Sequence, residues 1–182
     1  MIYCLLAKGF EEIEAVATVD ILRRAGIDVE TVAISKLPGE VVVGAHGMNF
    51  IADIKQKEID YDKLDGVFLP GGMPGTINLE KSKAVQNLLE YCYKNDKYIF
   101  AICAAPQILG HKGYLNGRKA TCYPGFEGEL TGAQLSEKPV VKDGKIITGK
   151  GPGVTTEFGL MIVETLKNAD VANKLRESMQ CQ

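Results

Sequence analysis

The stretch from Lys97 to Leu109, KYIFAICAAPQIL, places a cysteine where a strand-like apolar run gives way to a helix-like run. A strand that turns sharply into a helix strains the corner residue, and the corner side chain then projects clear of the sheet. The positions two before and two after Cys103 must then be small, and they hold Ala101 and Ala105. A thiol facing the positive end of a helix also gains thiolate character. The segment predicts a nucleophile elbow, and its alternative is a buried packing cysteine.

Two further loops carry groups that such a thiol would use. LPGGMPG offers the consecutive N–H groups of Gly71 and Gly72, which can stabilise an oxyanion, although alone it also fits a plain turn. EEIEAV starts a helix with three carboxylates, which complement the helix dipole. Glu14 lies partly toward the apolar face, where a protonated carboxyl could share a proton with a thiolate. Glu11 and Glu12 are expected in solvent.

Strands and helices alternate around these loops. We expect strands at 2–7, 28–34, 66–72, 98–102 and 119–123, two short strands within 41–53, and a hairpin over 140–149. We expect helices over 11–26, 82–96, from about 104, over 155–166 and over 169–179, with Ile13, Val16, Ala17 and Ile21 on the apolar face of the first. This alternation indicates a parallel sheet covered on both faces. Ligands bind beyond the carboxyl ends of such strands, where the three loops are expected to meet.

Composition narrows the class of protein. The 182 residues are 46% hydrophobic, which suits one domain over 1–182. A net charge of -2 with interspersed signs argues against nucleic acid and membrane-surface partners, and no apolar window would span a bilayer. The start lacks signal-peptide features. Five scattered cysteines fit neither a disulfide framework nor zinc spacing, so we expect a cytoplasmic protein without a metal or cofactor.

Five motifs at matching spacing carry a family resemblance: LAKGFEEIEAV, VDILRRAGIDV, VFLPGGMPG, AICAAP and GPGVTTEFGL. Together they resemble the DJ-1/PfpI superfamily, and within it the DJ-1 (ThiJ-like) branch, nearly end to end. The resemblance implies a flavodoxin-like α/β three-layer sandwich and usually a homodimer, with Arg24 near the interface. It implies that Cys103 is the oxidation-prone nucleophile and that Glu14 hydrogen-bonds its sulfur. Gly72, with the N–H of Ala104, would form the oxyanion-binding edge.

Some positions depart from the family pattern. Many members carry a histidine where Tyr123 stands here, and a tyrosine is a poor base at neutral pH, so Glu14 must carry proton transfer. The protease-like branch places a histidine where Ala104 stands, which argues against peptidase and amidotransferase activity. His46 is expected as an exposed loop residue, with a place in the pocket as the alternative. His111 lies two helical turns beyond the cysteine, too far to touch the thiol.

Two functions use the same residues. In the first, Cys103 attacks a small 2-oxoaldehyde such as methylglyoxal and forms a hemithioacetal, and Glu14 relays the proton that yields a hydroxy acid. Tyr123 and Pro152 border the pocket. This is a glutathione-independent glyoxalase of the glyoxalase III type, and the same chemistry would serve a deglycase-type hydrolase. In the alternative, Cys103 is an oxidative-stress sensor that is oxidised to a sulfinate, with a change in partner binding or chaperone activity.

Overall fold

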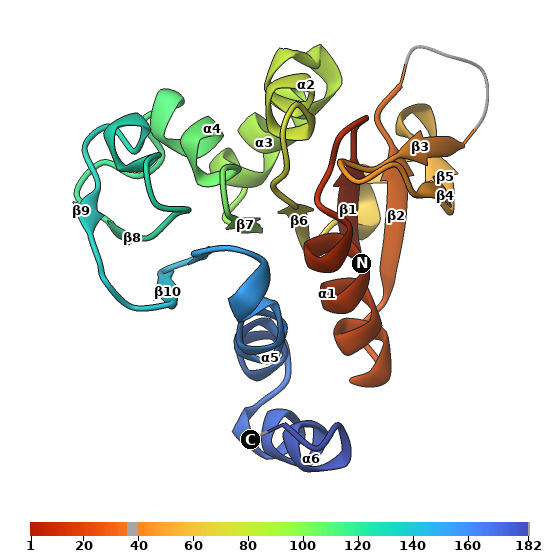
Figure 1. Ribbon diagram of the computed structural model, residues 1–182, viewed down its shortest axis with the longest axis vertical. Coiled ribbons are helices and arrows are strands. Elements are labelled where there is room, and N and C mark those ends of the chain that lie inside the picture. Colours follow the sequence, from red (N-terminus) through yellow and green to blue (C-terminus); the bar gives the residue numbers. More distant parts are fainter. Residues whose placement is uncertain (36–39, 182) are drawn as a thin grey trace.

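A central sheet organises the chain in the computed structural model, which describes residues 1–35 and 40–181 (Figure 1). Its seven strands lie in the order β10-β11-β7-β6-β1-β2-β5, and all neighbours are parallel except the β10–β11 hairpin. The strands are β1 (Ile2–Leu6), β2 (Val29–Ala33), β5 (Ile54–Lys55), β6 (Gly66–Leu69), β7 (Tyr98–Ile102), β10 (Val140–Asp143) and β11 (Ile146–Gly149). Two separate pairs are β3 (Val41–Val43) with β4 (Asn49–Ile51), and β8 (Lys119–Ala120) with β9 (Gln134–Leu135).

Helices cover both faces of this sheet. They are α1 (Glu12–Arg24), α2 (Gly75–Lys81), α3 (Lys83–Lys94), α4 (Pro106–His111), α5 (Thr155–Leu166) and α6 (Ala169–Ser178). Short 3-10 turns lie at Gln56–Glu58, Tyr61–Lys63, Glu127–Glu129 and Pro152–Val154. Figure 1 shows α1, α5 and α6 on one side of the strands and α2, α3 and α4 on the other. This is the predicted three-layer α/β sandwich.

The strand sequences explain the two layers, because successive side chains of a strand point to opposite faces. In β1, Ile2, Cys4 and Leu6 enter the core beneath α1 and α5, whereas Tyr3 and Leu5 enter the core beneath α3 and α4. Every residue of β1 is buried. A parallel strand buried on both faces therefore appears in the sequence as an unbroken apolar run.

The predicted apolar face of α1 is only partly correct: Ile21 is buried in the core, as expected, but two of its other members are not. The side chains of Ile13 and Val16 are 57% and 46% exposed, although both were expected in the core. The buried side of the helix contains Ala15, Val19 and Leu22, at the spacing of one helical face, together with the predicted Ile21. An apolar residue on α1 therefore does not by itself mark the face that meets the sheet.

Other element boundaries also differ from expectation. Helix α2 was not predicted, and its sequence GTINLEK is short and begins at a glycine. Helix α4 begins at Pro106, not near Ala104, and has six residues. Strand β8 ends at Ala120, well before the predicted end at 123. Among the described residues, no helix combines the length and the apolar character needed to cross a membrane.

The sheet order brings the three chemistry-bearing loops together. Strand β6 lies between β1 and β7, with Cys4 paired with Phe68 and Leu69 paired with Ala101. The loops that follow these strands therefore leave the same edge of the sheet side by side. The first leads into α1, the second carries the paired glycines, and the third begins at Cys103.

Candidate functional site

Cys103 stands at a strained corner directly after β7. Its backbone φ is +64°, in the left-handed region that non-glycine residues seldom adopt outside turns and functional sites. Its N–H donates to the carbonyl of Gly149 at 2.9 Å, which fixes the corner against β11. Ala101 and Ala105 are fully buried on either side. The half-buried thiol thus has the elbow geometry that the small flanking residues predict.

Glu14 reaches this thiol from the first turn of α1. The carboxyl is fully buried, its Oε2 accepts a hydrogen bond from the Gly71 N–H at 2.7 Å, and its Oε1 has no hydrogen-bond partner among the described residues. The carboxyl and the Cys103 thiol lie close enough for each to shift the pKa of the other. A Cβ built on Gly71 would lie 2.6 Å from the Cβ of Cys103 and 2.8 Å from Oε2 of Glu14. Only a glycine therefore lets the loop backbone, the carboxyl and the thiol pack together.

The pKa values of both Glu14 and Cys103 are strongly raised. Burial raises the pKa of Glu14 from 4.5 to about 7, against the opposing effects of the Gly71 hydrogen bond and of the neighbouring Cys103 thiol. Burial also raises the pKa of Cys103, to about 12, and the charge of Glu14 adds to this effect. When Glu14 holds a proton, its charge no longer opposes the thiolate. A carboxyl with a pKa near neutrality is suited to accept and return a proton.

Two backbone N–H groups oppose this rise of the thiol pKa. The N–H groups of Gly72 and Ala104 lie near enough to the Cys103 sulfur to lower the thiol pKa. The Gly71 N–H, also expected to stabilise an oxyanion, donates to Oε2 of Glu14 at 2.7 Å in this structure. Because α4 is short and begins only at Pro106, the stabilisation of negative charge comes from these individual donors more than from a helix dipole.

Tyr123 and Pro152 lie close to this corner. The Tyr123 N–H donates to the carbonyl of Cys103 at 2.9 Å, and its side chain is 45% exposed. A Cβ on Gly151 would lie 3.0 Å from the Tyr123 ring, so the ring rests against that glycine. Pro152 follows directly, and its carbonyl accepts a hydrogen bond from Thr155 Oγ1 at 2.8 Å. The two predicted pocket residues therefore lie next to each other.

The expectation that Glu12 lies in solvent is wrong, because this residue is only 4% exposed. Its Oε1 accepts from the His46 N–H at 2.7 Å, and its Oε2 lies 2.9 Å from His46 Nδ1. Burial opposes ionisation, but the hydrogen bonds from His46 hold the pKa of Glu12 below its usual value. A Cβ on Gly44 would lie 2.2 Å from Glu12 Oε1, so that glycine makes room for the contact.

His46 and two carboxylates form the group among the described residues whose geometry could hold a metal ion. One ligand-type atom from each of Glu11, Glu12 and His46 lies within 4.8 Å of the others. His46 is exposed, as expected, and these hydrogen-bonded carboxylates raise its pKa. We interpret the group as an ion pair that ties the 44–47 turn to α1. Because Glu12 and His46 are 34 residues apart in the chain, no local sequence pattern indicated that they pair.

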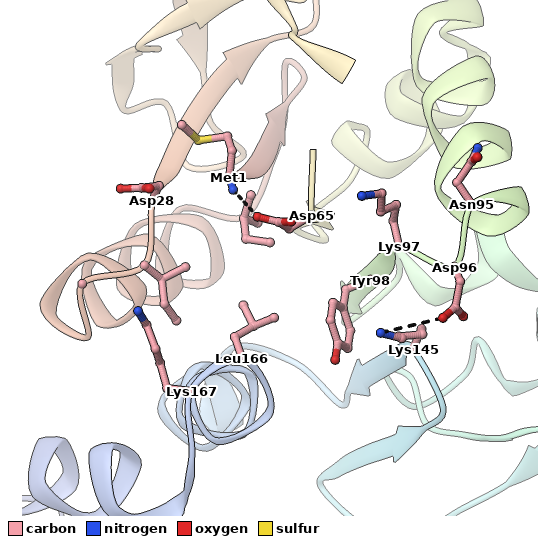
Figure 2. A pocket seen from close by; sticks show the side chains of 13 residues that line it. Met1, Asp28, Asp65, Asn95, Asp96, Lys97, Tyr98, Lys145, Leu166 and Lys167 are labelled. Carbon is pink, nitrogen blue, oxygen red and sulfur yellow. Dashed lines mark hydrogen bonds and ion pairs between the residues drawn. The ribbon is translucent and has the colours of Figure 1, made fainter. Parts of the chain in front are cut away.

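A cavity of about 520 Å³ lies at the opposite edge of the sheet (Figure 2). It is bounded by the starts of β1 and β7 and the end of α5, and its charged groups partly neutralise one another. Its labelled lining residues are Met1, Asp28, Asp65, Asn95, Asp96, Lys97, Tyr98, Lys145, Leu166 and Lys167. It lacks a nucleophile like Cys103, and it faces the amino ends of the strands. We therefore place the functional site at the carboxyl edge.

The fold and the site together define an α/β sandwich protein with a cysteine at a nucleophile elbow, paired with a buried carboxyl. Residues 1–165 match the DJ-1/PfpI family. The chain is 35% identical to protein dj-1beta of Drosophila melanogaster, covering 96% of this chain and 94% of that protein. It is 34% identical to a glutathione-independent glyoxalase of Caenorhabditis elegans, covering 91% and 87%. A structure of oxidized Toxoplasma gondii DJ-1 superposes with a TM-score of 0.93 at 33% identity, covering 98% and 97%. The chain belongs to the DJ-1/PfpI family.

Proposed function

We propose that this chain is a glutathione-independent glyoxalase that converts small 2-oxoaldehydes such as methylglyoxal into 2-hydroxy acids. The observation that carries the proposal is the contact between the Cys103 thiol and the fully buried Glu14, whose pKa is raised to about 7. Together they supply a nucleophile and a group that can hold or release a proton near neutral pH. The glyoxalase relative in Caenorhabditis elegans supports the same reaction class.

The proposed reaction begins with addition of the thiol to the aldehyde. The sulfur of Cys103 bonds to the aldehyde carbon, the carbonyl electrons move to oxygen, and that oxygen takes up the thiol proton. The product is a hemithioacetal. The N–H groups of Gly72 and Ala104, which lower the thiol pKa, are the donors that we assign to the negative oxygen that develops beside the sulfur.

Glu14 then moves a proton between the two adjacent carbons. Its carboxylate removes the hydrogen, as a proton, from the carbon that bears sulfur, which leaves an enediolate. The hydroxyl proton on that carbon then passes to the oxygen of the neighbouring carbon, and Glu14 returns its own proton to the neighbouring carbon itself. This produces a thioester of the 2-hydroxy acid. Water adds to the thioester carbonyl, and the bond to Cys103 breaks to release the acid and the thiol. One carbon is oxidised and its neighbour is reduced, so no external oxidant or cofactor is consumed. The same thiol addition would serve a deglycase.

The two histidines are poorly placed for peptidase chemistry, which needs an imidazole beside the nucleophile. His46 binds Glu12 through its backbone N–H and its Nδ1. His111 has both ring nitrogens at carboxylate oxygens of other residues. The residue after the cysteine is Ala104. Glu14 is therefore the proton-transfer group that we assign.

Replacing Cys103 by alanine is expected to abolish lactate formation from methylglyoxal in the absence of glutathione, because no other group can form the covalent intermediate. The matched control is Cys181→Ser, which changes the partly exposed thiol near the chain end. The control should keep the wild-type rate. An alanine variant that turns over normally, or a wild-type protein without activity, would overturn the glyoxalase proposal.

A redox-sensor function is the second candidate, favoured by the half-buried thiol that lies against two backbone donors. Two successive peroxide molecules would each transfer an oxygen atom to the sulfur and leave as water, giving a sulfinate held by Gly72 and Ala104. A changed partner binding or chaperone activity would follow. The oxidized Toxoplasma gondii DJ-1 structure is consistent with this chemistry in the family. Selective oxidation of Cys103 without any lactate formation would favour the sensor.

All five cysteines are free, as in a reducing compartment such as the cytoplasm, where we place the protein.

We further propose that the chain forms a homodimer through the exposed apolar side of α1 and the β3–β4 hairpin. Large apolar side chains gather there and are roughly half to three-quarters exposed: Ile13, Val16, Val41, Met48 and Ile51. Val16 and Ile51 line one groove together with Phe50. Contiguous apolar surface of this kind marks an interaction site. An isologous contact between two copies would cover it and place α1, with Arg24, at the seam.

A charge placed on this surface should split the dimer. Ile51 is the most exposed of these side chains, at 77%, so Ile51→Glu should leave the fold intact and shift the protein from twice the chain mass to the chain mass. Light scattering coupled to size exclusion measures this directly. Leu135→Glu, on the separate β9 strand, is the control and should stay dimeric. A monomeric wild-type protein would contradict the proposal.

A further inference from the structure

His111 holds two carboxylates from two different elements. It is the last residue of α4, and its Nδ1 lies 2.5 Å from Oε1 of Glu80 while its Nε2 lies 2.8 Å from Oε2 of Glu129. Glu80 belongs to α2, and Glu129 ends the 3-10 turn that follows β8. A carboxylate only accepts hydrogen bonds, so both ring nitrogens must donate. The geometry therefore requires an imidazolium that bridges two negative charges.

The bridged elements are those that carry the functional site. Helix α4 follows Cys103, α2 follows Gly72, and the 3-10 turn follows Tyr123. A chain of backbone hydrogen bonds joins the last of these to the thiol residue. The Tyr123 N–H donates to the Cys103 carbonyl at 2.9 Å, the Phe126 N–H to the Tyr123 carbonyl at 3.1 Å, and the Glu129 N–H to the Phe126 carbonyl at 3.0 Å.

Close packing reinforces the link between α4 and the 3-10 turn. A Cβ on Gly110 would lie 2.2 Å from the carbonyl oxygen of Glu129 and 2.8 Å from the Cα of Leu130. The segment from 121 to 130 is thus pressed against the end of α4, next to His111. A shift of Glu129 away from His111 would be transmitted along the hydrogen-bonded turns to Tyr123.

We propose that His111 is a positioning residue whose imidazolium clamps the 121–130 segment to α2 and α4 and thereby restricts access to the Cys103 thiol. Opening of the clamp frees Tyr123 to move away from the corner, and reagents then reach the sulfur more readily. The inference rests on Cys103 being the reactive group of the proposed function. The experiment that tests this inference measures only chemical modification of the Cys103 thiol. An absence of glyoxalase activity would therefore leave its result unchanged.

The clamp depends on pH in a defined direction. The hydrogen bonds to Glu80 and Glu129 raise the pKa of His111 above its ordinary value of 6.5. The clamp is therefore complete below that ordinary value and is lost as the pH rises through the raised folded pKa. Glu80 from α2 and Glu129 from the 3-10 turn are the charged groups that act on the ring. The neighbouring Lys112 directs its Nζ to Gln86 in α3, at 2.9 Å.

The experiment compares the alkylation rate of Cys103 by iodoacetamide in His111→Gln and in the wild-type protein, followed by peptide mass spectrometry. At about pH 6 the wild-type clamp is closed and the variant is open, so we expect a variant-to-wild-type ratio of about 3 to 10. At about pH 9 both are open, and the ratio should approach 1. The thiolate fraction of Cys103 cancels in each ratio. Cys181 in the same digest is the internal reference.

Two further variants keep the test decisive if the first one folds poorly. Glu129→Ala removes the other partner from a half-exposed site and should show the same ratios as His111→Gln. Lys112→Gln changes the adjacent residue and should show a ratio near 1 at both pH values. A ratio that is raised equally at both pH values would mean general loosening, and a ratio of 1 throughout would mean no clamp. Either result overturns the proposal.

Discussion

Glu14→Gln is expected to carry a more reactive Cys103 thiol than the wild-type protein, even though the substitution removes the proposed proton relay. In the wild type, burial raises the pKa of Cys103 and the charge of Glu14 raises it further. The amide removes that charge, and its NH₂ group can donate to the sulfur. In the variant, the N–H groups of Gly72 and Ala104 still lower the thiol pKa, and the negative charge of Glu14 no longer opposes them. The pKa of Cys103 should fall.

The measurement is the alkylation rate of Cys103 at about pH 8, where the wild-type Glu14 is mostly ionised because its pKa is about 7. Each unit by which the thiol pKa falls should raise the thiolate fraction by about tenfold and the alkylation rate by about threefold, because a less basic thiolate is a weaker nucleophile. Glu11→Gln is the matched control, because the Glu11 charge acts on Glu14 and is not among the influences on the thiol. A rate in Glu14→Gln that equals the wild-type rate would show that the carboxylate does not suppress the thiolate.

Gly72→Ala is expected to destabilise the protein by about 3 kcal/mol or more, which is a large effect for one methyl group. The backbone φ of Gly72 is +88°, and its Cβ would lie 2.4 Å from the Glu11 nitrogen, 2.6 Å from the Gly9 oxygen and 2.7 Å from the carbonyl carbon of Phe10. All three atoms are backbone, so none can rotate away. The loop would have to move and carry its N–H away from Cys103.

A second glycine separates the two causes of this effect. Gly26 has a φ of +66° but open space around its Cβ position. Gly26→Ala therefore introduces the conformational strain without the clash and should cost about 1 kcal/mol. Urea unfolding of both variants measures the difference. If Gly72→Ala is no less stable than Gly26→Ala, the loop is not packed as tightly as the structure places it.

The sequence predicted the elements whose signals are local. The unbroken apolar runs of β1, β6 and β7 indicated a parallel sheet buried on both faces, and the structure confirms that sandwich. The small residues around Cys103 agree with its positive φ, because the elbow geometry is set within a few positions of the corner. The convergence of the three loops followed from strand adjacency.

Features set by distant contacts were not predictable in the same way. The expected apolar face of α1 was wrong for Ile13 and Val16, which point away from the sheet, although Ile21 is buried as expected. Nothing in the helix sequence alone distinguishes its core-facing side from its exposed side. Glu12 was expected in solvent, yet its environment is created by the turn at Gly44 and His46. Glu14 is fully buried because a glycine loop 57 residues away supplies its N–H donor.

The most direct test of the central claim is the rate of lactate formation from methylglyoxal, without glutathione, by Glu14→Gln relative to the wild-type protein. The same preparation should first be shown to carry a reactive Cys103 thiol. If the pair works as proposed, the variant should lose activity by about 10²-fold to 10⁴-fold, the range for removal of a general acid–base group. A variant that forms lactate at the wild-type rate would contradict the account, because the proton would then be moving without Glu14.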